Sequence, residues 1–417
     1  MTAPADRRPA APLFTPVLLV GSAILLVSFG IRAAFGVFQI PVAEEFGWLR
    51  TEFSLAIAVQ NLAWGIGQPI FAALGDRFGA RRALLAGAVV YALGLALSAA
   101  AVTPAQHQLL ALLVGFGVAG TGFGVILGVV GRAAAPERRP MALAVATAAG
   151  SGGQVIGPPV AEALLAVMPW QGVFLVFAAA SLALLLLLPA MRAPQAPDAS
   201  DGPPMGEALL RAVRDPSYAL IFLGFFSCGY QLGFITAHFP AFVTEYCGPI
   251  LAGGLLASLG VTSTSVLGAI ALSVIGLANI AGTLAAGWLG GRFPKKFLLS
   301  SIYAGRTLVA AAFILTPITP GTVLLFSVAM GALWLATVPL TSGLIAQIYG
   351  VRFMGTLYGL VFLSHQIGSF LGVWLGGALY DLTGGYTLVW WVGVGVGAFS
   401  ALVHLPIRER RLDAQPA

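Results

Sequence analysis

Apolar and polar segments alternate along almost the whole of this chain. Twelve apolar segments are each roughly 20 to 28 residues long, which is the length that a tilted helix needs to cross a bilayer. Charged residues, prolines and glycines separate these segments. The predicted spans are 16–40, 52–74, 83–103, 107–131, 141–164, 172–190, 218–245, 263–290, 297–316, 321–346, 355–379 and 385–406. The pattern therefore predicts an all-α membrane protein with twelve transmembrane helices.

The composition agrees with a membrane protein and argues against several other classes. Hydrophobic residues make up 59% of the 417 positions and charged residues only 9%, whereas soluble domains carry roughly 25% charged residues. The two cysteines, Cys228 and Cys247, indicate neither a disulfide framework nor a metal site. The sequence shows no nucleophile–base pair, metal cluster or phosphate-binding loop, so we expect no enzyme, no cofactor and no bound metal.

The basic residues gather on one side of the predicted membrane. Eighteen of the 21 lysines and arginines lie in the two tails or in the loops that follow even-numbered spans. Arg50 lies on the opposite side, and Arg32 and Arg306 fall inside spans. Because positive loops stay in the cytoplasm, both termini are predicted to be cytoplasmic, in the inner membrane of a cell. The net charge of +6 thus reflects membrane topology, and no nucleic-acid partner is expected.

A polar segment rich in proline, aspartate and glycine divides the chain into two halves of six spans. This segment cannot bury a core, so we predict a flexible cytoplasmic linker. The predicted domains are an N-terminal tail over 1–15, a six-helix bundle over 16–190, the linker over 191–217, a second six-helix bundle over 218–406 and a C-terminal tail over 407–417.

The two halves carry a related motif at the same place. The sequence LGDRFG at 74–79 follows the second span, and LGGRFP at 289–294 follows the eighth span. The offset between the two copies is 215 residues. Two six-helix repeats predict a pseudo-symmetric pair of bundles, with a binding site between them near the middle of the membrane.

Arg32 lies well inside the first apolar segment. A charge near the centre of a bilayer costs from about 3 to more than 10 kcal/mol, and such residues persist where they face a cavity and meet a counter-ion. No Asp or Glu lies deep in any apolar segment to neutralise this charge. Since a guanidinium pairs well with a carboxylate, we interpret Arg32 as a candidate binding residue for a small organic anion. Arg306, near mid-depth in the ninth span, is a second anion-site candidate.

The motif after the second span resembles the signature of a transporter family. Residues 75–82, GDRFGARR, are similar to the loop signature of the major facilitator superfamily, and the resemblance covers the whole chain. It implies a secondary transporter in which two six-helix bundles rock about a central site. It also implies that Asp76, Arg77 and Arg81 gate the path by contacting the cytoplasmic end of the other half. The second copy of the motif has Gly291 where the aspartate would stand.

Two further segments resemble the monocarboxylate transporters and their bacterial relatives. Residues 31–38, IRAAFGVF, are similar to the first helix of that branch, which carries a basic residue at the position of Arg32. Residues 44–53, EEFGWLRTEF, are similar to its first external loop. The resemblance implies a monocarboxylate substrate and proton symport. Those transporters usually carry an Asp and an Arg in helix 8, where this chain has Asn279 instead.

Several polar and aromatic side chains share helix faces in the spans that line or flank the path in the resembled fold. Convergence on a water-filled cavity would satisfy polar groups that lipid cannot satisfy. Together with Arg32, the candidate substrate contacts are Phe35, Gln39, Gln60, Tyr230, His238, Asn279, Trp334, Tyr358 and His365. His365 is also the candidate carrier of a coupling proton, because imidazole titrates near neutral pH.

Each of these residues also has a structural interpretation. A polar side chain in a membrane helix often joins two helices, and Trp334 is equally typical of packing. His365 is compatible with an ordinary buried hydrogen bond. Arg306 could instead cap backbone carbonyls or pair with Tyr303, and the charge of Asp76 could serve topology alone.

Three functions are open on the sequence alone. The leading hypothesis is a proton-coupled transporter of a small organic anion, in particular a monocarboxylate, that acts as a monomer in the lipid bilayer. Proton-driven efflux of hydrophobic drug-like compounds is an alternative, since residues 153–159 partly resemble a motif of drug/proton antiporters. A non-transporting membrane sensor is a further alternative, although the sequence contains no soluble signalling domain.

Overall fold

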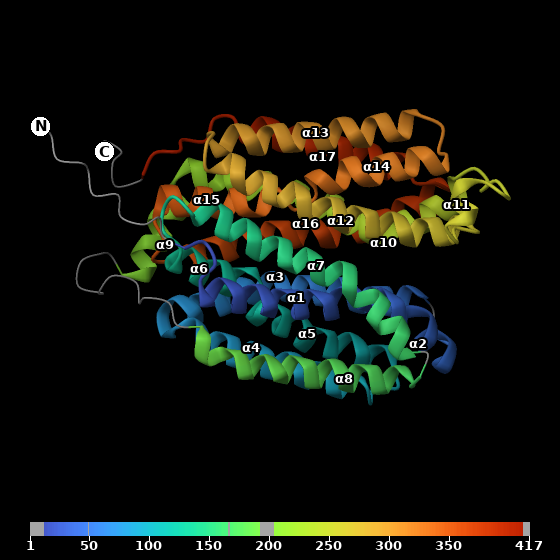
Figure 1. Ribbon diagram of the computed structural model, residues 1–417, viewed down its shortest axis with the longest axis horizontal. Coiled ribbons are helices and arrows are strands. Elements are labelled where there is room, and N and C mark those ends of the chain that lie inside the picture. The colour runs from blue at the N-terminus through green and yellow to red at the C-terminus, as the bar shows by residue number, and fades with distance from the viewer. Residues whose placement is uncertain (1–11, 49, 166, 192–203, 412–417) are drawn as a thin grey trace, which may run out of the picture.

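Helices form at every predicted span. The computed structural model describes residues 12–48, 50–165, 167–191 and 204–411, and within these ranges it contains helices and no strand (Figure 1). The N-terminal half comprises α1 (Pro16–Ala34), η1 (Phe35–Phe38), α2 (Gln39–Phe46), α3 (Arg50–Phe78), α4 (Ala80–Ser98), α5 (Pro104–Thr121), α6 (Phe123–Ala133), α7 (Arg139–Leu165), α8 (Trp170–Ala183) and η2 (Leu184–Ala190). The C-terminal half comprises α10 (Pro216–Tyr246), α11 (Leu255–Ser258), α12 (Thr264–Gly290), α13 (Lys295–Leu315), α14 (Pro320–Leu333), α15 (Thr337–Tyr349), α16 (Met354–Thr383) and α17 (Thr387–Val403).

Matching caps begin the fourth and tenth spans. Thr103 precedes α5 and Thr319 precedes α14, and each hydroxyl accepts a hydrogen bond from the backbone N–H three residues later. Pro104 and Pro320 then occupy the first helical position, where a missing N–H costs nothing. The spacing between the two caps is close to the 215 residues that separate the repeated motifs, as expected for two related halves.

Nine of the twelve predicted spans, counted over the described residues, are long and apolar enough to cross a membrane by length and composition alone. The other three are α3, α7 and α17, of which α17 has only 17 residues. α3 and α7 both lie between other helices, α3 against α5 and α16 and α7 against α1 and α12. A helix that is covered by its neighbours needs less apolar surface than one that faces lipid.

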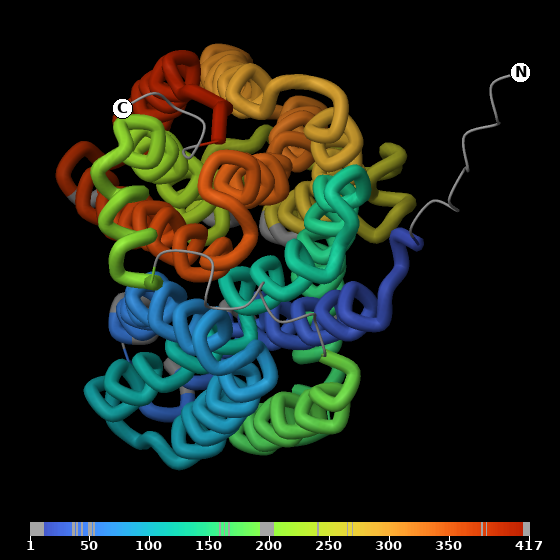
Figure 2. Tube along the Cα trace, turned by 90° about the vertical axis from the view of Figure 1, so that its left-hand side faces the viewer, coloured from blue at the N-terminus to red at the C-terminus, as the bar shows by residue number. Residues whose placement is uncertain are grey.

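The helices form two bundles that lie side by side (Figures 1 and 2). In the N-terminal bundle α1 packs on α7, α3 packs on α5, and α4 packs on α5 and α8. In the C-terminal bundle α10 packs on α16, α12 on α14 and α13 on α17. The bundles meet where α3 and α6 contact α16, and where α7 contacts α12 and α15. The fold is therefore the pseudo-symmetric pair of six-helix bundles that the repeated motif predicts.

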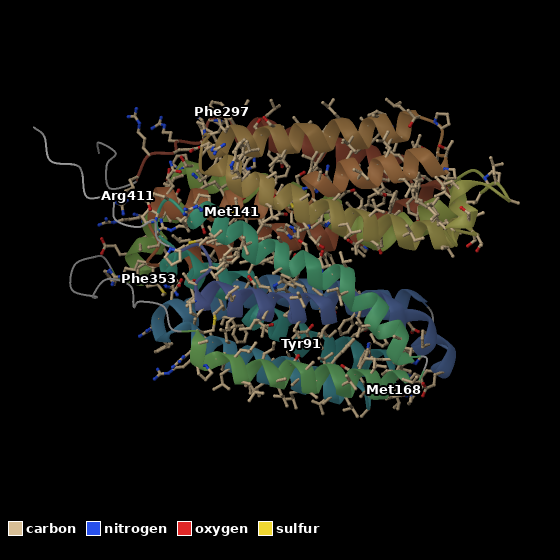
Figure 3. All side chains as sticks on the ribbon, in the orientation of Figure 1. Tyr91, Met141, Met168, Phe297, Phe353 and Arg411 are labelled. Atoms are coloured by element: carbon tan, nitrogen blue, oxygen red, sulfur yellow. The ribbon has the colours of Figure 1, made fainter. Side chains whose placement is uncertain are left out.

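The two ends of the molecule differ in charge. The loops after α3, α6, α12 and α15 lie at the end where Figure 3 shows Phe353 and Arg411, and we call this the basic end. The opposite end, where Figure 3 shows Met168, carries Glu45 and Glu245, and we call it the acidic end. All the loops that the charge pattern assigns to one side of the membrane thus lie at one end of the fold.

Glycines let helices of one bundle approach backbone to backbone. A Cβ atom on Gly153 would lie 2.0 Å from the carbonyl oxygen of Leu26, and one on Gly157 would lie 2.0 Å from that of Gly30. α7 therefore packs on α1 with no room for a side chain at either glycine. Small residues at such contacts are the usual basis of helix association in lipid.

The fourth and tenth spans are both interrupted near the middle of the molecule. α5 ends before Gly122, which has extended backbone angles, and α6 follows directly. In the tenth span, residues 334–336 separate α14 from α15. Pro339 lies in the first turn of α15, where its lack of an N–H is tolerated, whereas a continuous helix would lose a hydrogen bond there. Interruptions at matching positions of two repeats are typical of transporter binding sites.

Parts of the predicted tails and linker, residues 1–11, 192–203 and 412–417, lie outside the described residues. Within the remaining part of the predicted linker, α9 (Met205–Arg214) forms a helix. Glu207 and Arg211 lie one turn apart and pair at 2.5 Å, a spacing that supports a short exposed helix.

The packing of α7 on α1 gives a prediction about stability. Gly153→Ala should destabilise the protein by about 1–3 kcal/mol, because its methyl group would overlap the carbonyl of Leu26. Gly152→Ala is the matched control, since its Cβ would meet nothing nearer than a Leu26 methyl group at 3.9 Å. Thermal unfolding of the two purified variants checks this. Equal melting temperatures would show that the contact between α1 and α7 does not constrain the fold.

Candidate functional site

Arg32 lies in the last turn of α1 and is partly buried. Its Nη2 donates a hydrogen bond to Asn61 Oδ1 at 3.0 Å, and its guanidinium carbon lies 4.7 Å from the centre of the Trp64 ring. None of the ion pairs among the described residues involves Arg32. A neutral amide and an aromatic face therefore hold this cation in place without neutralising it.

The partners of Arg32 lie at the boundary between the bundles. The Trp64 ring is 4.8 Å from the ring of Phe362, which belongs to α16 of the other half. Gln366, one turn further along α16, donates a hydrogen bond to the carbonyl of Asn61 at 3.0 Å. The Arg32 guanidinium thus lies beside the contact between α3 and α16, where the two bundles must separate or slide if the protein changes conformation.

Phe35 opens the 3-10 turn η1 that follows α1. It packs against Phe38 and Phe174 inside the N-terminal half, with ring centroids 6.4 and 5.6 Å away, so its ring faces the interior of its own bundle. The side chain of Gln39 lies outside the described part of the structure.

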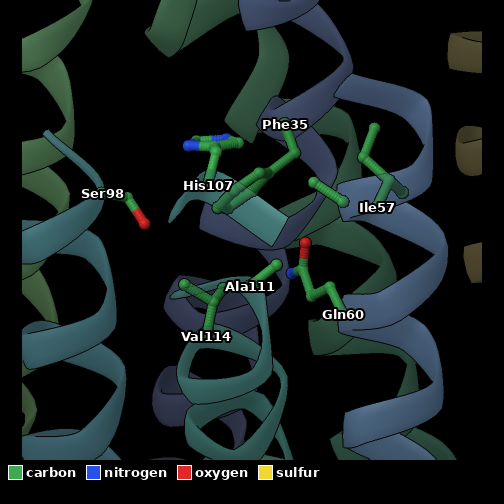
Figure 4. Close-up of a pocket in the computed structure, with 8 residues that line it drawn as sticks. Phe35, Ile57, Gln60, Ser98, His107, Ala111 and Val114 are labelled. Atoms are coloured by element: carbon green, nitrogen blue, oxygen red, sulfur yellow. The ribbon is translucent and has the colours of Figure 1, made fainter. Parts of the chain in front are cut away.

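Gln60 also points into the N-terminal half. It lines a narrow cavity together with Phe35, Ser98 and His107 (Figure 4), and this cavity leaves no room for a water molecule. Its Nε2 has no hydrogen-bond partner. In this conformation the cavity lies within one bundle and not between the two, so Gln60 and Phe35 are not brought together with Arg32 at the boundary.

Asn279 ties the interruption of the tenth span to the other bundle. Its Oδ1 accepts hydrogen bonds from the backbone N–H of Leu335 at 2.8 Å and from the hydroxyl of Thr283 at 3.0 Å. Its Nδ2 donates to Ser151 Oγ on α7 at 2.7 Å. Because Leu335 lies between α14 and α15, Asn279 satisfies an N–H group that the interrupted helix cannot satisfy by itself.

Arg306 binds the opposite side of the same interruption. Its side chain is fully buried, and its Nη1 donates to the carbonyl of Trp334 at 3.4 Å and to Cys228 Sγ at 3.2 Å. Its Nε and Nη2 have no hydrogen-bond partner. Capping of a released carbonyl therefore accounts for one of the three guanidinium nitrogens and leaves the other two unexplained.

Corresponding positions of the two halves carry different side chains. The offset of 215 residues that relates the repeated motifs also relates Trp64 to Asn279 and Tyr91 to Arg306. A Cβ on Gly122, at the interruption of the fourth span, would lie 3.3 Å from Trp64 Nε1. Figure 3 shows Tyr91 inside the N-terminal bundle, where it is as fully buried as Arg306 is in the other. The halves thus share an architecture, and they differ in the chemistry at the same places.

Polar contacts cross the boundary between the two intramembrane arginines. Hydrogen bonds join Arg32 to Asn61, Asn61 to Gln366, and Gln366 to His365, whose Nδ1 lies 2.8 Å from Gln366 Oε1. Arg306 bonds to Cys228 on α10. The backbone of His365 packs beside this cysteine, because a Cβ on the next residue, Gly229, would lie 1.6 Å from the carbonyl oxygen of His365. His365 is therefore placed between the two cations, and its Nε2 has no hydrogen-bond partner among the described residues.

Three other predicted contacts point into the C-terminal half. Tyr358 is fully buried and its hydroxyl has no hydrogen-bond partner. Tyr230 donates to the carbonyl of Val389 at 3.5 Å, and His238 Nε2 lies 2.9 Å from the carbonyl of Val373. Tyr230 and His238 thus contact backbone within their own bundle and do not face Arg32 in this conformation.

Asp76 connects the two bundles at the basic end. Its Oδ1 accepts from Arg132 at 2.5 Å, and its Oδ2 accepts from both the backbone N–H and the hydroxyl of Thr356, each at 2.7 Å. Thr356 lies in the first turn of α16, so a carboxylate from one half caps a helix of the other. The side chain of Asp76 is only 2% exposed.

Arg77 and Arg81 do not make the contact with the other half that the family resemblance implies. Arg77 is exposed and lies over the ring of its neighbour Phe78 at 5.1 Å. Arg81 donates to the carbonyls of Leu188 at 2.9 Å and of Pro189, both in η2 of its own half. The loop turns at Gly79, which has a φ of 92°, and this turn directs Arg81 back over η2.

Sequence patterns do not single out four residues that matter here. Arg132 is one of the basic residues that follow the topology pattern, and its place directly after a long uncharged span is its one distinguishing signal. Cys228 belongs to neither a disulfide nor a metal motif. Ser151 and Thr356 carry no sequence signal, because their roles depend on which helix faces them.

The contact at the basic end gives a prediction about conformation. Asp76→Asn should shift the protein at least about tenfold toward a state that is open at the basic end, because Arg132 then remains buried without a partner. Spin labels at the exposed positions Arg138 and Arg292, on opposite bundles, report this separation. Glu207→Gln is the control, since it removes an exposed pair of little energy. An unchanged distance distribution in Asp76→Asn would contradict the prediction.

Comparisons with known proteins agree with this architecture. Residues 20–319 match the family described as Major Facilitator Superfamily. The chain is 26% identical to the uncharacterized MFS-type transporter YcxA of Bacillus subtilis (strain 168), a match that covers 94% of this chain and 93% of YcxA. It is 27% identical to monocarboxylate transporter 13 of Rattus norvegicus, with 91% and 85% covered.

A solved structure shows the same fold. The fucose:proton symporter FucP of E. coli superposes with a TM-score of 0.69 over 93% of this chain and 97% of FucP, at 15% sequence identity. The family match covers most of the chain. It agrees with the structure, which has two related bundles, an interrupted span in each and a signature loop that joins them. The chain therefore belongs to the major facilitator superfamily, and it is a multi-pass membrane transporter and not an enzyme.

Proposed function

We propose that this protein is a secondary transporter of a small organic anion, and specifically of a monocarboxylate. The observation that carries the proposal is Arg32, a cation at the boundary between the bundles whose partners are a neutral amide and an indole ring. Because a guanidinium binds a carboxylate through two parallel hydrogen bonds, an arriving monocarboxylate would supply the counter-ion that the protein lacks there. The similarity to monocarboxylate transporter 13 of Rattus norvegicus supports this substrate class.

The proposed transport cycle is alternating access between two ends. The basic end faces the cytoplasm in this proposal, in accordance with the positive-inside rule, and the protein works as a monomer in the inner membrane. Asp76 acts as a gate, because its bonds to Thr356 hold the basic ends of the bundles together. Arg81 supports this gate indirectly by fixing the loop from which Asp76 projects.

The proposed binding site lies at the interrupted spans. Asn279 and Trp334 flank the interruption in the C-terminal half, and His365 carries the coupling proton within the polar chain between the arginines. Phe35, Gln39, Gln60, Tyr230, His238 and Tyr358 are proposed contacts that line the path only after the bundles move.

Removal of the Arg32 charge tests the proposed function. Arg32→Gln should lower the uptake of radiolabelled lactate or pyruvate into proteoliposomes by at least about thirtyfold, since a buried charged hydrogen bond to the substrate is lost. Arg410→Gln is the matched control, because it removes the same charge at an exposed position of the basic end. Uptake is measured with and without an inward proton gradient, and equal insertion of the variants is checked by immunoblot.

Two results would contradict the proposal. Uptake by Arg32→Gln equal to that of Arg410→Gln would remove Arg32 from the site. Transport of hydrophobic cations, in the absence of any carboxylate uptake by the wild-type protein, would favour the efflux alternative.

A further inference from the structure

The guanidinium of Arg306 presents a free edge inside the C-terminal bundle. Its Nη1 is occupied by Trp334 and Cys228, whereas Nε and Nη2 have no partner and the side chain is fully buried. In a planar guanidinium the N–H of Nε and one N–H of Nη2 point in parallel, which is the arrangement that binds both oxygens of a carboxylate. The unoccupied edge is therefore the one suited to a bidentate anion.

The surroundings of Arg306 offer further donors and no counter-ion. None of the ion pairs among the described residues involves Arg306. Tyr358 and Tyr303 are fully buried beside Cys228, and the hydroxyl of each has no hydrogen-bond partner. His365, whose backbone packs beside Cys228, has no hydrogen-bond partner at Nε2. Because Nδ1–H donates to Gln366 Oε1, this nitrogen accepts in the neutral ring and donates once the ring carries a second proton. The guanidinium edge and the two hydroxyls form a set of buried donors that is unfavourable unless an acceptor enters, because neither protein nor lipid satisfies it.

The interruption of the tenth span lies between this group and the boundary of the bundles. Arg306 binds the carbonyl of Trp334, and Asn279 binds the N–H of Leu335, the next residue, while also reaching Ser151 of the other half. Movement of the bundles that breaks the bond between Asn279 and Ser151 acts directly on residues 334–336. The backbone of this segment is tied to the flanking helices by three-residue bonds, from Trp334 N–H to Gly331 and from Val338 N–H to Leu335, in place of the regular α-helical ladder.

We propose that Arg306 is the carboxylate subsite of the transport site in the C-terminal half. When the bundles move, residues 334–336 shift and the carboxylate of the substrate binds both N–H groups of the Nε–Nη2 edge. Tyr358 donates to the same oxygens, and so does His365 when its ring carries the coupling proton. Arg32 then attracts the anion at the boundary and Arg306 holds it. The inference rests on the proposed function in naming the substrate, whereas the anion site itself does not depend on transport.

Binding to the purified wild-type protein tests this subsite. Pyruvate and lactate should raise its melting temperature in a concentration-dependent way, and pyruvamide and lactamide, which lack the charge, should not. Arg306→Lys keeps the charge and a donor for Trp334 but lacks the fork, so its carboxylate affinity should fall at least about tenfold. Arg410→Gln should bind as the wild type does. Carboxylate affinity in Arg306→Lys equal to that of the wild type would overturn the subsite.

The two cysteines allow a second measurement that does not depend on stability. In a Cys247→Ser background, Cys228 is the remaining thiol and it touches Arg306. A small thiol reagent should label Cys228 when the interruption opens. Pyruvate should slow this labelling in the Cys247→Ser protein that retains Arg306, but not in the same protein with Arg306→Lys. Labelling that is insensitive to pyruvate, or absent in every condition, would overturn the proposed entry of substrate.

The outcomes separate this inference from the proposed function. If Arg32→Gln loses uptake while Arg306→Lys transports and binds normally, the proposed function stands and the subsite fails. If the wild type takes up no carboxylate but is stabilised by carboxylates through Arg306, the site stands and the proposed function fails. Stabilisation by chloride or nitrate as strong as by pyruvate, and lost in Arg306→Lys, would show a site for inorganic anions and overturn the carboxylate assignment.

Discussion

An interrupted helix inside a membrane must find partners for the backbone groups that it releases. Lipid offers none, and each unsatisfied group costs several kcal/mol. In the tenth span the released N–H of Leu335 binds Asn279 and the released carbonyl of Trp334 binds Arg306. Two polar side chains from neighbouring helices thus make the interruption possible, and the rest of the proposed site is built around them.

The same side chains connect the interruption to the rest of the protein. Asn279 also bonds to Ser151 across the boundary, and Arg306 bonds to Cys228 on α10, which packs on α16. At the basic end the bundles are joined separately by the carboxylate of Asp76. A conformational change that opens the basic end must break the short polar contacts at Asp76, and one that loosens the middle must disturb the interruption. Polar contacts thus hold the bundles together at two different depths.

The intramembrane charges of the proposed site are all positive. Two arginines lie within the spans, and among the described residues neither forms an ion pair with a carboxylate. Trp64 and Asn279 occupy corresponding positions of the two halves, so one half supports Arg32 with an aromatic face while the other supports the backbone with an amide. A pseudo-symmetric fold therefore carries an asymmetric site, which suits a substrate with one charged end.

The sequence by itself determined the number of spans, the division into halves and the presence of uncompensated charge at Arg32, because hydrophobic length and charge are properties of each segment alone. It also identified Asp76 through the signature loop. Only the tertiary structure decided which helix faces pack against each other. Phe35 packs on Phe38 and Phe174 within its own half, Arg81 binds carbonyls of η2, and Arg306 binds a carbonyl that a helix interruption releases. Helix rotation and interruptions depend on neighbouring helices, so no local pattern encodes them.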